Sequence, residues 1–480
     1  MIINILGWVL TIEGILLFVP FFIDLIYKEG TGRSYLITAA CTITVGLIIA
    51  RNKPKSTVFY LKEGCAATAL SWITISFIGA IPLFVSGDIP SFIDALFESV
   101  SGFTTTGATI LSDVEALSHA GLFWRSLTHW IGGVGVLMFL LTVIPLTGGS
   151  STNLMRAETS GPVSGKVAPK IMTTARMIYL IYIVLTVAEL FALRLAGMDL
   201  FDATTTSLSN AATGGLAAHT TSMAAFSPSI QWIVVVFMIL FSINFNVFYL
   251  IMLGQLKKAL TNEQLRWYLG IIVFAVAVIF IDFIRLGIAT ADTFRETAFS
   301  VTSVLSSTGF AVADYNLWPD TARVMLVLLM FVGGCAGSTS GGILKISRFV
   351  IILKTLFAEI YSYIHPRSVK VIKSEGKPVS PNVIRSIYSY FGTYLLIMII
   401  SLILVSLNGY DLVTTATSVF ATTNNIGPGL GLVGPMGNYG DFSVLSKIVF
   451  MFDMFIGRLE IFPLIILFSP GAWKNTFRHR

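Results

Sequence analysis

The chain has 480 residues, of which 55% are hydrophobic and only 12% are charged, and its mean hydropathy is +0.83. Soluble domains are usually about one-quarter charged, so this composition excludes an ordinary water-soluble protein. The formal net charge is +6, but Lys and Arg alternate with apolar runs instead of forming one basic face, which argues against nucleic-acid binding.

Long apolar runs predict membrane-spanning helices along the whole chain. Two come first, over about residues 3–26 and 35–50. The first lacks a basic start and a small-residue cleavage site, so we interpret it as a retained helix and not as a signal peptide. Later runs are Met177–Leu195, Gln231–Leu253, Tyr268–Ile288 and Tyr390–Leu407. We expect about ten spanning helices in total.

Four glycine-centred strings recur at intervals of roughly a hundred residues, each between two long apolar segments. Their central glycines are Gly107, Gly214, Gly309 and Gly427. The pattern predicts four copies of one unit, in which a short re-entrant piece lies between two membrane helices. Four such units around one axis can build an ion pore from a single chain. The alternative is four outer loops with ordinary turn glycines, and the matched flanking helices argue against it.

An aspartate precedes each central glycine by 12 to 17 residues, at Asp94, Asp202, Asp292 and Asp411. Aspartate near a helix start interacts favourably with the exposed N–H groups and the positive end of the dipole. A helix of about 12 residues is about 18 Å long, roughly half a bilayer, and cannot cross it. Each string therefore predicts a half-helix that enters the membrane and returns, buried in protein or lining a cavity.

Backbone carbonyls can replace the hydration shell of a permeating cation, and glycine allows the backbone angles that turn them toward an axis. The C-terminal ends of four half-helices would add a negative field, which favours a monovalent cation over an anion. One central glycine in each string predicts a short filter that discriminates weakly between monovalent cations. The candidate filter residues are Thr105, Thr106, Gly107, Ala212, Thr213, Gly214, Ser307, Thr308, Gly309, Asn425, Ile426 and Gly427.

The placement of basic residues predicts the orientation, because Lys and Arg concentrate in cytoplasmic loops. The stretches that hold the glycine strings are poor in basic residues, which places the strings outside and both termini in the cytoplasm. Two long polar breaks, at about Gly148–Lys170 and His365–Pro381, fall on the basic side. Each is either a docking surface for a soluble partner or a plain linker, and the second contains a Glu-Gly pair that would suit a hairpin turn.

Two features lie deep in the later apolar segments. Gly333–Gly342 is so rich in glycine that a helix should break there, although small residues could instead form a close helix–helix contact. Arg458 lies in the apolar segment from about Val444 to Phe468, where a charge is costly and is usually functional. The alternative is that buried carboxylates such as Asp453 or Glu189 hold this arginine.

The strings Ser101–Thr109 and Asn424–Gly431 resemble pore loops one and four of the TrkH/TrkG family of potassium-uptake proteins, in the superfamily that also contains KtrB. The resemblance covers essentially the whole chain and includes the two N-terminal helices. It implies an all-α membrane protein with four helix–pore-loop–helix repeats around a central pore plus two N-terminal transmembrane helices. It further implies K⁺ uptake across the bacterial cytoplasmic (inner) membrane, with K⁺ as the transported ion and no bound cofactor.

The resemblance also implies partners and a gate. The partners would be a cytoplasmic, nucleotide-binding regulatory ring similar to TrkA, a second copy of the chain in a homodimer, and membrane lipid, but no nucleic acid. The gate would be an intramembrane loop beneath the filter together with an arginine that projects into the pore. Ser340 stands where this family is expected to have glycine. The implied gate residues are Gly333, Gly334, Gly337, Ser338, Thr339, Gly341, Gly342 and Arg458.

We expect five parts: two extra N-terminal helices (1–62) and four pore repeats (63–170, 171–262, 263–380 with the gate loop, and 381–480).

A Na⁺- or H⁺-coupled symporter is an alternative because the apolar segments contain carboxylates, at Glu13, Glu98, Glu189, Asp282 and Asp453. A multi-pass membrane enzyme would need converging His, Asp and Glu residues, and the sequence has only scattered ones. Gly429–Gly434 matches a dinucleotide-binding pattern but lacks the strand and helix that such a site needs.

Overall fold

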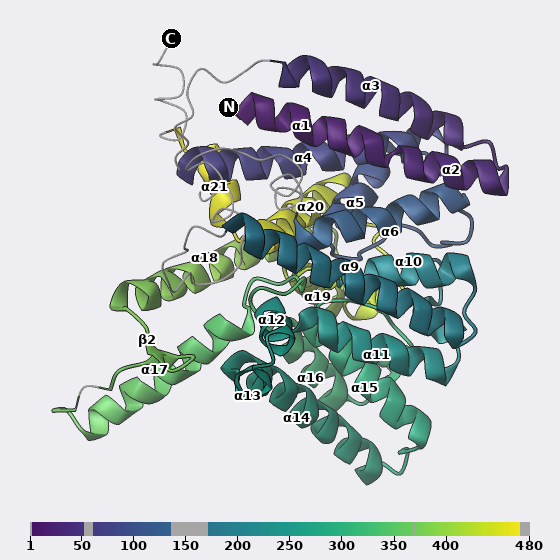
Figure 1. Cartoon of the computed structure of the whole chain (residues 1–480). Coiled ribbons are helices and arrows are strands. Elements are labelled where there is room, and N and C mark those ends of the chain that lie inside the picture. The colour runs from purple at the N-terminus through teal and green to yellow at the C-terminus, as the bar shows by residue number, and fades with distance from the viewer. Residues whose placement is uncertain (1, 52–60, 136–170, 369, 471–480) are drawn as a thin grey trace.

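The computed structural model describes residues 2–51, 61–135, 171–368 and 370–470, and almost all of its regular structure is helical (Figure 1). The chain begins with α1 (Ile2–Leu16) and α2 (Phe18–Tyr27), which form one membrane pass, and α3 (Gly32–Ala50) returns beside them. Gly7 and Gly46 allow α1 and α3 to pack closely, because a Cβ on Gly46 would lie 2.8 Å from the Gly7 carbonyl oxygen. The polar break at Gly148–Lys170 lies outside the described residues.

The rest of the chain repeats one arrangement four times, with a long outer helix, a half-helix and an inner helix. Repeat one has α4 (Leu61–Val85), α5 (Phe92–Phe103) and α6 (His119–Val134). Repeat two has α9 (Ile171–Leu195), α10 (Leu200–Ala211), η1 (Ser222–Ala225), α11 (Pro228–Ser242) and α12 (Phe245–Met252), followed by α13 (Leu256–Leu260). Repeat three has α14 (Glu263–Arg285), α15 (Ala291–Leu305), η2 (Tyr315–Leu317), α16 (Asp320–Met330) and α17 (Ile346–Ile364). Repeat four has α18 (Pro381–Ser406), α19 (Leu412–Thr423), η3 (Gly431–Val433), α20 (Val444–Leu459) and α21 (Phe462–Phe468).

This arrangement confirms the expected fold class of four repeats plus two N-terminal helices. Six helical segments in the described part of the chain are long and apolar enough to cross a membrane. They are the α1–α2 pass, α3 and the outer helices α4, α9, α14 and α18. Large apolar side chains face outward on these helices, such as Phe274 at 63% exposure and Ile403 at 61%. A surface of this kind suits lipid contact.

The inner helices differ from the expected continuous spans. They have 16, 15, 11 and 16 residues for α6, α11, α16 and α20, so each is shorter than the ~20 residues that cross a bilayer. The predicted single run Gln231–Leu253 is wrong, since α11 and α12 meet at an angle of 90°. Asn244 explains the restart, because its side chain accepts a hydrogen bond from the N–H of Asn246 and begins α12.

The four half-helices begin as the sequence predicts, with a polar side chain capping each first turn. The capping residues are Ser91, Asp199, Thr290 and Asp411, and each side chain accepts a backbone N–H. Asp94, Asp202 and Asp292 lie in the first turns. Hydrogen bonds from the side chain and backbone of Thr414 lower the pKa of Asp411. The capping side chains and the negative charge of these aspartates both stabilise the start of a helix.

The expected hairpin after His365 is present. Strands β1 (Lys373–Ser374) and β2 (Lys377–Pro378) pair antiparallel around Glu375 and Gly376. These two turn residues have φ values of 51° and 75°, as a two-residue hairpin turn requires. Figure 1 shows α17, the hairpin and the start of α18 extending away from the other helices.

Candidate functional site

All four half-helices end in the same backbone turn. The second residue past each helix has a left-handed conformation although it is not glycine: Thr105 at φ 54°, Thr213 at 52°, Ser307 at 57° and Asn425 at 51°. In repeat one the Thr105 N–H donates to the Gly102 carbonyl at 3.0 Å, and the next N–H donates to the Ser101 carbonyl at 2.9 Å. The other three repeats have the same pair of bonds. This is a Schellman motif, and a non-glycine residue in it costs about 1–2 kcal/mol, so surrounding contacts hold the turn.

A glycine with positive φ follows two positions later in each repeat. These glycines are Gly107 at 77°, Gly215 at 81°, Gly309 at 83° and Gly427 at 90°. The predicted central glycine of repeat two, Gly214, is therefore wrong by one residue, and Ala212 does not belong to the equivalent set. The reason is where α10 ends: Ala212 is its C-cap, and its carbonyl accepts the Thr213 hydroxyl at 2.6 Å. Gly214 takes the position of Thr106, Thr308 and Ile426.

The four strings enclose a ring. A Cβ on each positive-φ glycine would collide with a main-chain carbonyl of the next repeat, and the fourth glycine returns to the first repeat. The distances from such a Cβ to the carbonyl oxygens are 2.1 Å for Gly107 to Gly214, 1.9 Å for Gly215 to Thr308, 2.0 Å for Gly309 to Ile426 and 2.7 Å for Gly427 to Thr106. Asn425 closes the ring by donating to the Thr106 hydroxyl at 2.9 Å. Glycine is required here because the backbones touch.

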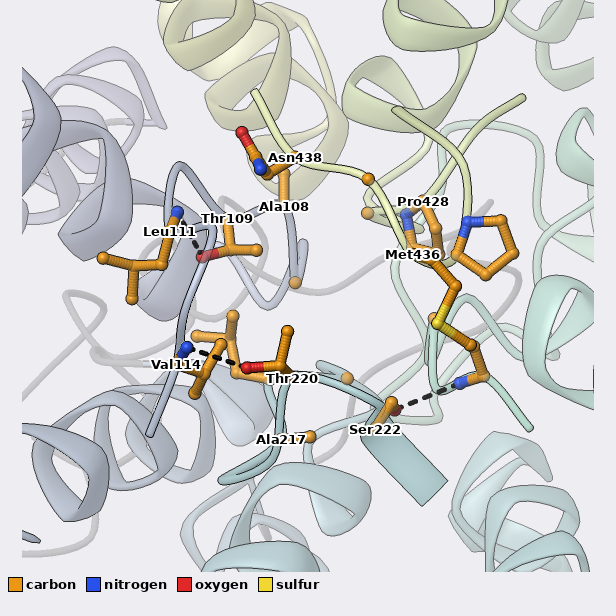
Figure 2. Close-up of a pocket in the computed structure, with 18 of the residues that line it drawn as sticks. Ala108, Thr109, Leu111, Val114, Ala217, Thr220, Ser222, Pro428, Met436 and Asn438 are labelled. Carbon is orange, nitrogen blue, oxygen red and sulfur yellow. Dashed lines mark hydrogen bonds between the residues drawn. The ribbon is translucent and has the colours of Figure 1, made fainter. Parts of the chain in front are cut away.

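The four glycines also line one open cavity, shown in Figure 2. Its wall consists of the segments that leave the ring, and side-chain hydroxyls join neighbouring repeats. Thr220 accepts the N–H of Val114 at 2.9 Å, and Ser222 accepts the N–H of Ala311 at 3.2 Å. Within the described ranges, no three His, Cys, Asp or Glu side chains form a group that could hold a metal ion. The oxygens that surround the ring are main-chain carbonyls and hydroxyls, which suit a weakly held monovalent cation.

A buried ion pair lies at the wall of this cavity, where Arg125 is one of the lining residues. Arg125 Nε donates to Glu98 at 2.7 Å, and the two side chains are 2% and 0% exposed. Glu98 also accepts the N–H of Ile110 at 3.2 Å, and Arg125 donates to the Ala217 carbonyl at 3.4 Å. The pair therefore joins the outgoing segments of repeats one and two. Sequence reasoning missed Arg125, which stands in the apolar α6 and was visible there as an intramembrane charge.

Of the remaining intramembrane carboxylates, Glu189 and Asp453 bond to polar side chains of neighbouring helices. Asn210 donates to Glu189 at 2.5 Å, and Ser401 donates to Asp453 at 2.7 Å. Asp282 pairs with Arg285 at 3.0 Å, and neither carboxylate oxygen of Glu13 has a hydrogen-bond partner among the described residues. In the part of the chain that the structure describes, none of the carboxylates considered for ion coupling lines the cavity.

The Gly333–Gly342 stretch breaks its helix as expected, because α16 ends at Met330 and α17 begins at Ile346. The alternative, a continuous helix whose small residues pack against another helix, is therefore wrong. The loop lies in the bend between α11 and α12, where the Cys335 N–H donates to the Ser242 carbonyl at 3.0 Å. The next part of the loop consists of Gly337, Ser338 and Thr339. There the Phe245 N–H donates to the Gly337 carbonyl at 3.0 Å, and the Ser338 hydroxyl donates to the Cys335 carbonyl at 2.7 Å.

The end of this loop contacts the ring. The hydroxyls of Ser340 and Ser307 are 2.9 Å apart, and a Cβ on Gly341 would lie 2.7 Å from the Asn425 Cβ. The Ser340 hydroxyl also accepts the N–H of Gly334 at 2.9 Å. Ser340, which stands where a glycine was expected, therefore links the two ends of the loop by a hydrogen bond. The loop therefore lies directly against the end of the ring at which the half-helices stop, which we call the helix-side end.

Arg458 reaches the loop from α20. Its guanidinium donates to the carbonyls of Thr339 at 2.9 Å, Gly132 at 2.5 Å and Gly133 at 2.6 Å. The carboxylates considered as alternative partners bond elsewhere, since Asp453 accepts from Ser401 and Glu189 accepts from Asn210. Arg458 thus links the intramembrane loop to the end of α6.

Sequence reasoning missed two further basic residues at the loop. Lys345 Nζ donates to the carbonyls of Ser340 and Gly341, and Arg348 donates to the Ile343 carbonyl at 2.9 Å and pairs with Glu460. The signal was two basic residues within six positions of a glycine-rich break in an apolar segment, where unpaired carbonyls need donors.

Comparison with known proteins gives a family match over most of the chain. The family model TrkH, described as a cation transport protein, matches residues 34–475. The Trk system potassium uptake protein TrkH of Escherichia coli K12 is 33% identical over 465 residues, which cover 95% of each chain. TrkG of the same organism is 34% identical and covers 98% of this chain and 97% of its own. The crystal structure of the potassium transporter TrkH from Vibrio parahaemolyticus superposes with a TM-score of 0.88 at 30% identity, over 98% of this chain and 99% of that chain.

Proposed function

Since the chain belongs to the TrkH family of cation transport proteins, and is a multi-pass potassium-uptake protein of the inner membrane and not an enzyme, we propose that K⁺ crosses it through the ring. The single observation that carries this proposal is the closed contact of four glycines with four main-chain carbonyls. Four half-helices direct their C-terminal ends at the ring, which places negative partial charge around a passing cation.

The proposed filter follows the register of the backbone turns. Ala212 leaves the set and Gly215 enters it, because only Gly215 occupies the position of the other positive-φ glycines. The proposed filter residues are Thr105, Thr106, Gly107, Thr213, Gly214, Gly215, Ser307, Thr308, Gly309, Asn425, Ile426 and Gly427. Each repeat contributes one positive-φ glycine to the ring, which supports a short filter, so we expect K⁺ to be preferred over Na⁺ without strict exclusion of Na⁺.

The proposed gate is the intramembrane loop with Arg458. The residues expected from the sequence were Gly333, Gly334, Gly337, Ser338, Thr339, Gly341, Gly342 and Arg458. The position of the loop supports this role, because the loop touches Ser307 and Asn425 at the helix-side end of the ring. A cation that leaves the ring on that side meets the loop and the guanidinium charge. Movement of the loop away from Ser307 and Asn425 would clear the path.

We assign the loop side of the ring to the cytoplasm, with both chain termini there, because basic residues concentrate around α17 and the hairpin. The projecting α17–hairpin–α18 segment (Figure 1) would dock a cytoplasmic nucleotide-binding regulatory ring on a homodimer. We also propose the division into residues 1–62, 63–170, 171–262, 263–380 and 381–480, which keeps each half-helix with its own two flanking helices.

Purified protein in liposomes tests the transport proposal directly. We expect ⁸⁶Rb⁺ uptake driven by a K⁺ gradient to persist with no Na⁺ and no pH gradient, because none of the described carboxylates lines the cavity. Excess Na⁺ should compete weakly. The control is protein-free liposomes. Uptake that requires a Na⁺ or pH gradient would favour the symporter, and uptake that excludes Na⁺ strictly would contradict the short filter.

A further inference from the structure

Three cationic side chains hold the carbonyls at the end of the intramembrane loop. Arg458 donates to the Thr339 carbonyl at 2.9 Å and Arg348 donates to the Ile343 carbonyl at 2.9 Å. Between them, the Lys345 ammonium donates to the carbonyl of Gly341 at 2.8 Å and to that of Ser340. The two arginines have other roles in the structure, since Arg458 also bonds α6 and Arg348 pairs with Glu460. Lys345 bonds only main-chain carbonyls of this loop among its described hydrogen bonds.

The surroundings of Lys345 resemble a cation site and not a salt bridge. The residue is 3% exposed, and no carboxylate lies within ion-pair distance of its ammonium in the described residues. A primary ammonium group and a potassium ion carry the same charge, have similar size and are both held by rings of carbonyl oxygens. Burying a charge with neutral partners is costly, and here only main-chain carbonyls of the loop compensate the Lys345 ammonium.

The two carbonyls that hold Lys345 are next to the ring. Gly341 packs against Asn425, with its Cβ position 3.2 Å from the Asn425 carbonyl oxygen and 3.2 Å from the Ser307 hydroxyl. Ser340 bonds to Ser307. Both contacts are to the left-handed residues that end the half-helices of repeats three and four. A cation moving from the ring toward the loop therefore reaches Ser340 and Gly341 first.

We propose that Lys345 is a tethered cation whose ammonium occupies the carbonyl site of Ser340 and Gly341 that a K⁺ ion leaving the ring would otherwise take, so that conduction requires Lys345 to leave this site. The proposal rests on the pore described under the proposed function. Lys345 is the N-cap of α17, so a shift of α17 would withdraw the ammonium. The projecting α17 would in this way connect a cytoplasmic contact to the site beneath the ring.

Lys345→Met tests the proposal in liposomes containing the full chain alone. Removing the ammonium should raise basal ⁸⁶Rb⁺ influx roughly tenfold, since a charge-assisted hydrogen bond no longer opposes entry to the site. Methylammonium should then inhibit Lys345→Met much more strongly than the unmodified protein, because it can fill the vacated carbonyl site. Tetramethylammonium, which has no N–H group, should not. Lys345→Arg should keep influx low.

Lys354→Met is the matched control, because Lys354 lies on the same helix but pairs with Glu263 near the surface. It should leave influx and methylammonium sensitivity unchanged. Lys345→Gln, which keeps N–H donors but no charge, should conduct like Lys345→Met. Influx that stays unchanged or falls in both Lys345→Met and Lys345→Gln would overturn the proposal. Raised influx without methylammonium sensitivity would also overturn it, as would failure of both of these variants to fold. Absence of ⁸⁶Rb⁺ influx from the unmodified chain and from Lys345→Met and Lys345→Gln alike would instead defeat the pore itself.

Discussion

Replacing Gly309 with alanine is expected to abolish Rb⁺ uptake while the protein still folds in the membrane. Gly309 has φ 83°, and a Cβ there would lie 2.0 Å from the Ile426 carbonyl oxygen. The left-handed conformation costs an alanine about 1–2 kcal/mol, and the clash is with a main-chain oxygen and not with the end of a flexible side chain. Ile426 must therefore move its carbonyl, and every 1.36 kcal/mol added to the barrier lowers the rate about tenfold. We expect a loss of roughly 100-fold or more.

Gly392→Ala is the control for this experiment. Gly392 lies on α18, has no heavy atom within 4 Å of its Cβ position and has no positive φ. Alanine there should leave uptake unchanged and should stabilise the helix by up to ~1 kcal/mol. Uptake should be compared at equal amounts of monodisperse protein. Normal uptake by Gly309→Ala would mean that its backbone contact with Ile426 does not shape the pathway.

Replacing Arg458 with methionine is expected to raise basal Rb⁺ uptake. The guanidinium joins the Thr339 carbonyl of the loop to the Gly132 and Gly133 carbonyls of α6. Methionine keeps most of the side-chain volume but frees the loop and removes a positive charge from beneath the ring. Hydrogen bonds from charged donors contribute about 1.5–3 kcal/mol each, so a gain of roughly tenfold is expected. The measurement is ⁸⁶Rb⁺ influx in liposomes without any soluble partner.

Arg323→Met is the matched control for Arg458, because Arg323 lies on the inner helix α16 but pairs with Asp320 at its exposed start. It should leave influx unchanged. Arg458→Lys should conduct less than Arg458→Met, since it keeps the charge. If influx is the same in Arg458→Met and in the unmodified protein, Arg458 is a packing residue and the gate must depend on other contacts.

The fourfold plan of the protein was predictable from sequence because each repeat places the same polar-to-glycine string between apolar segments. The register of repeat two was not, since Gly214 and Gly215 are adjacent and composition cannot choose between them. The choice depends on where α10 ends, at Ala211, which is set by packing. The 90° bend after Ser242 was missed for a related reason: hydropathy measures how apolar a run is and not whether it is straight, although Asn244 inside the run was a possible helix start.

The partners of the buried charges were also beyond sequence reasoning. Arg458 bonds main-chain carbonyls of the loop and of α6, and these partners could not be foreseen. Every residue carries a carbonyl, so no pattern of side chains marks which ones an arginine will meet. The same holds for Lys345. Only the broken helix at Gly333–Gly342 shows where carbonyls lack helical partners, and that break was predictable from its glycines.

The position of a bound ion tests the central claim most directly. Rb⁺ or Tl⁺ can replace K⁺, and anomalous scattering from crystals of the protein locates these ions. The account predicts a peak inside the ring, coordinated by main-chain carbonyls of the four strings that contain Gly107, Gly215, Gly309 and Gly427. Ions bound only outside this ring, with none among those carbonyls, would contradict it.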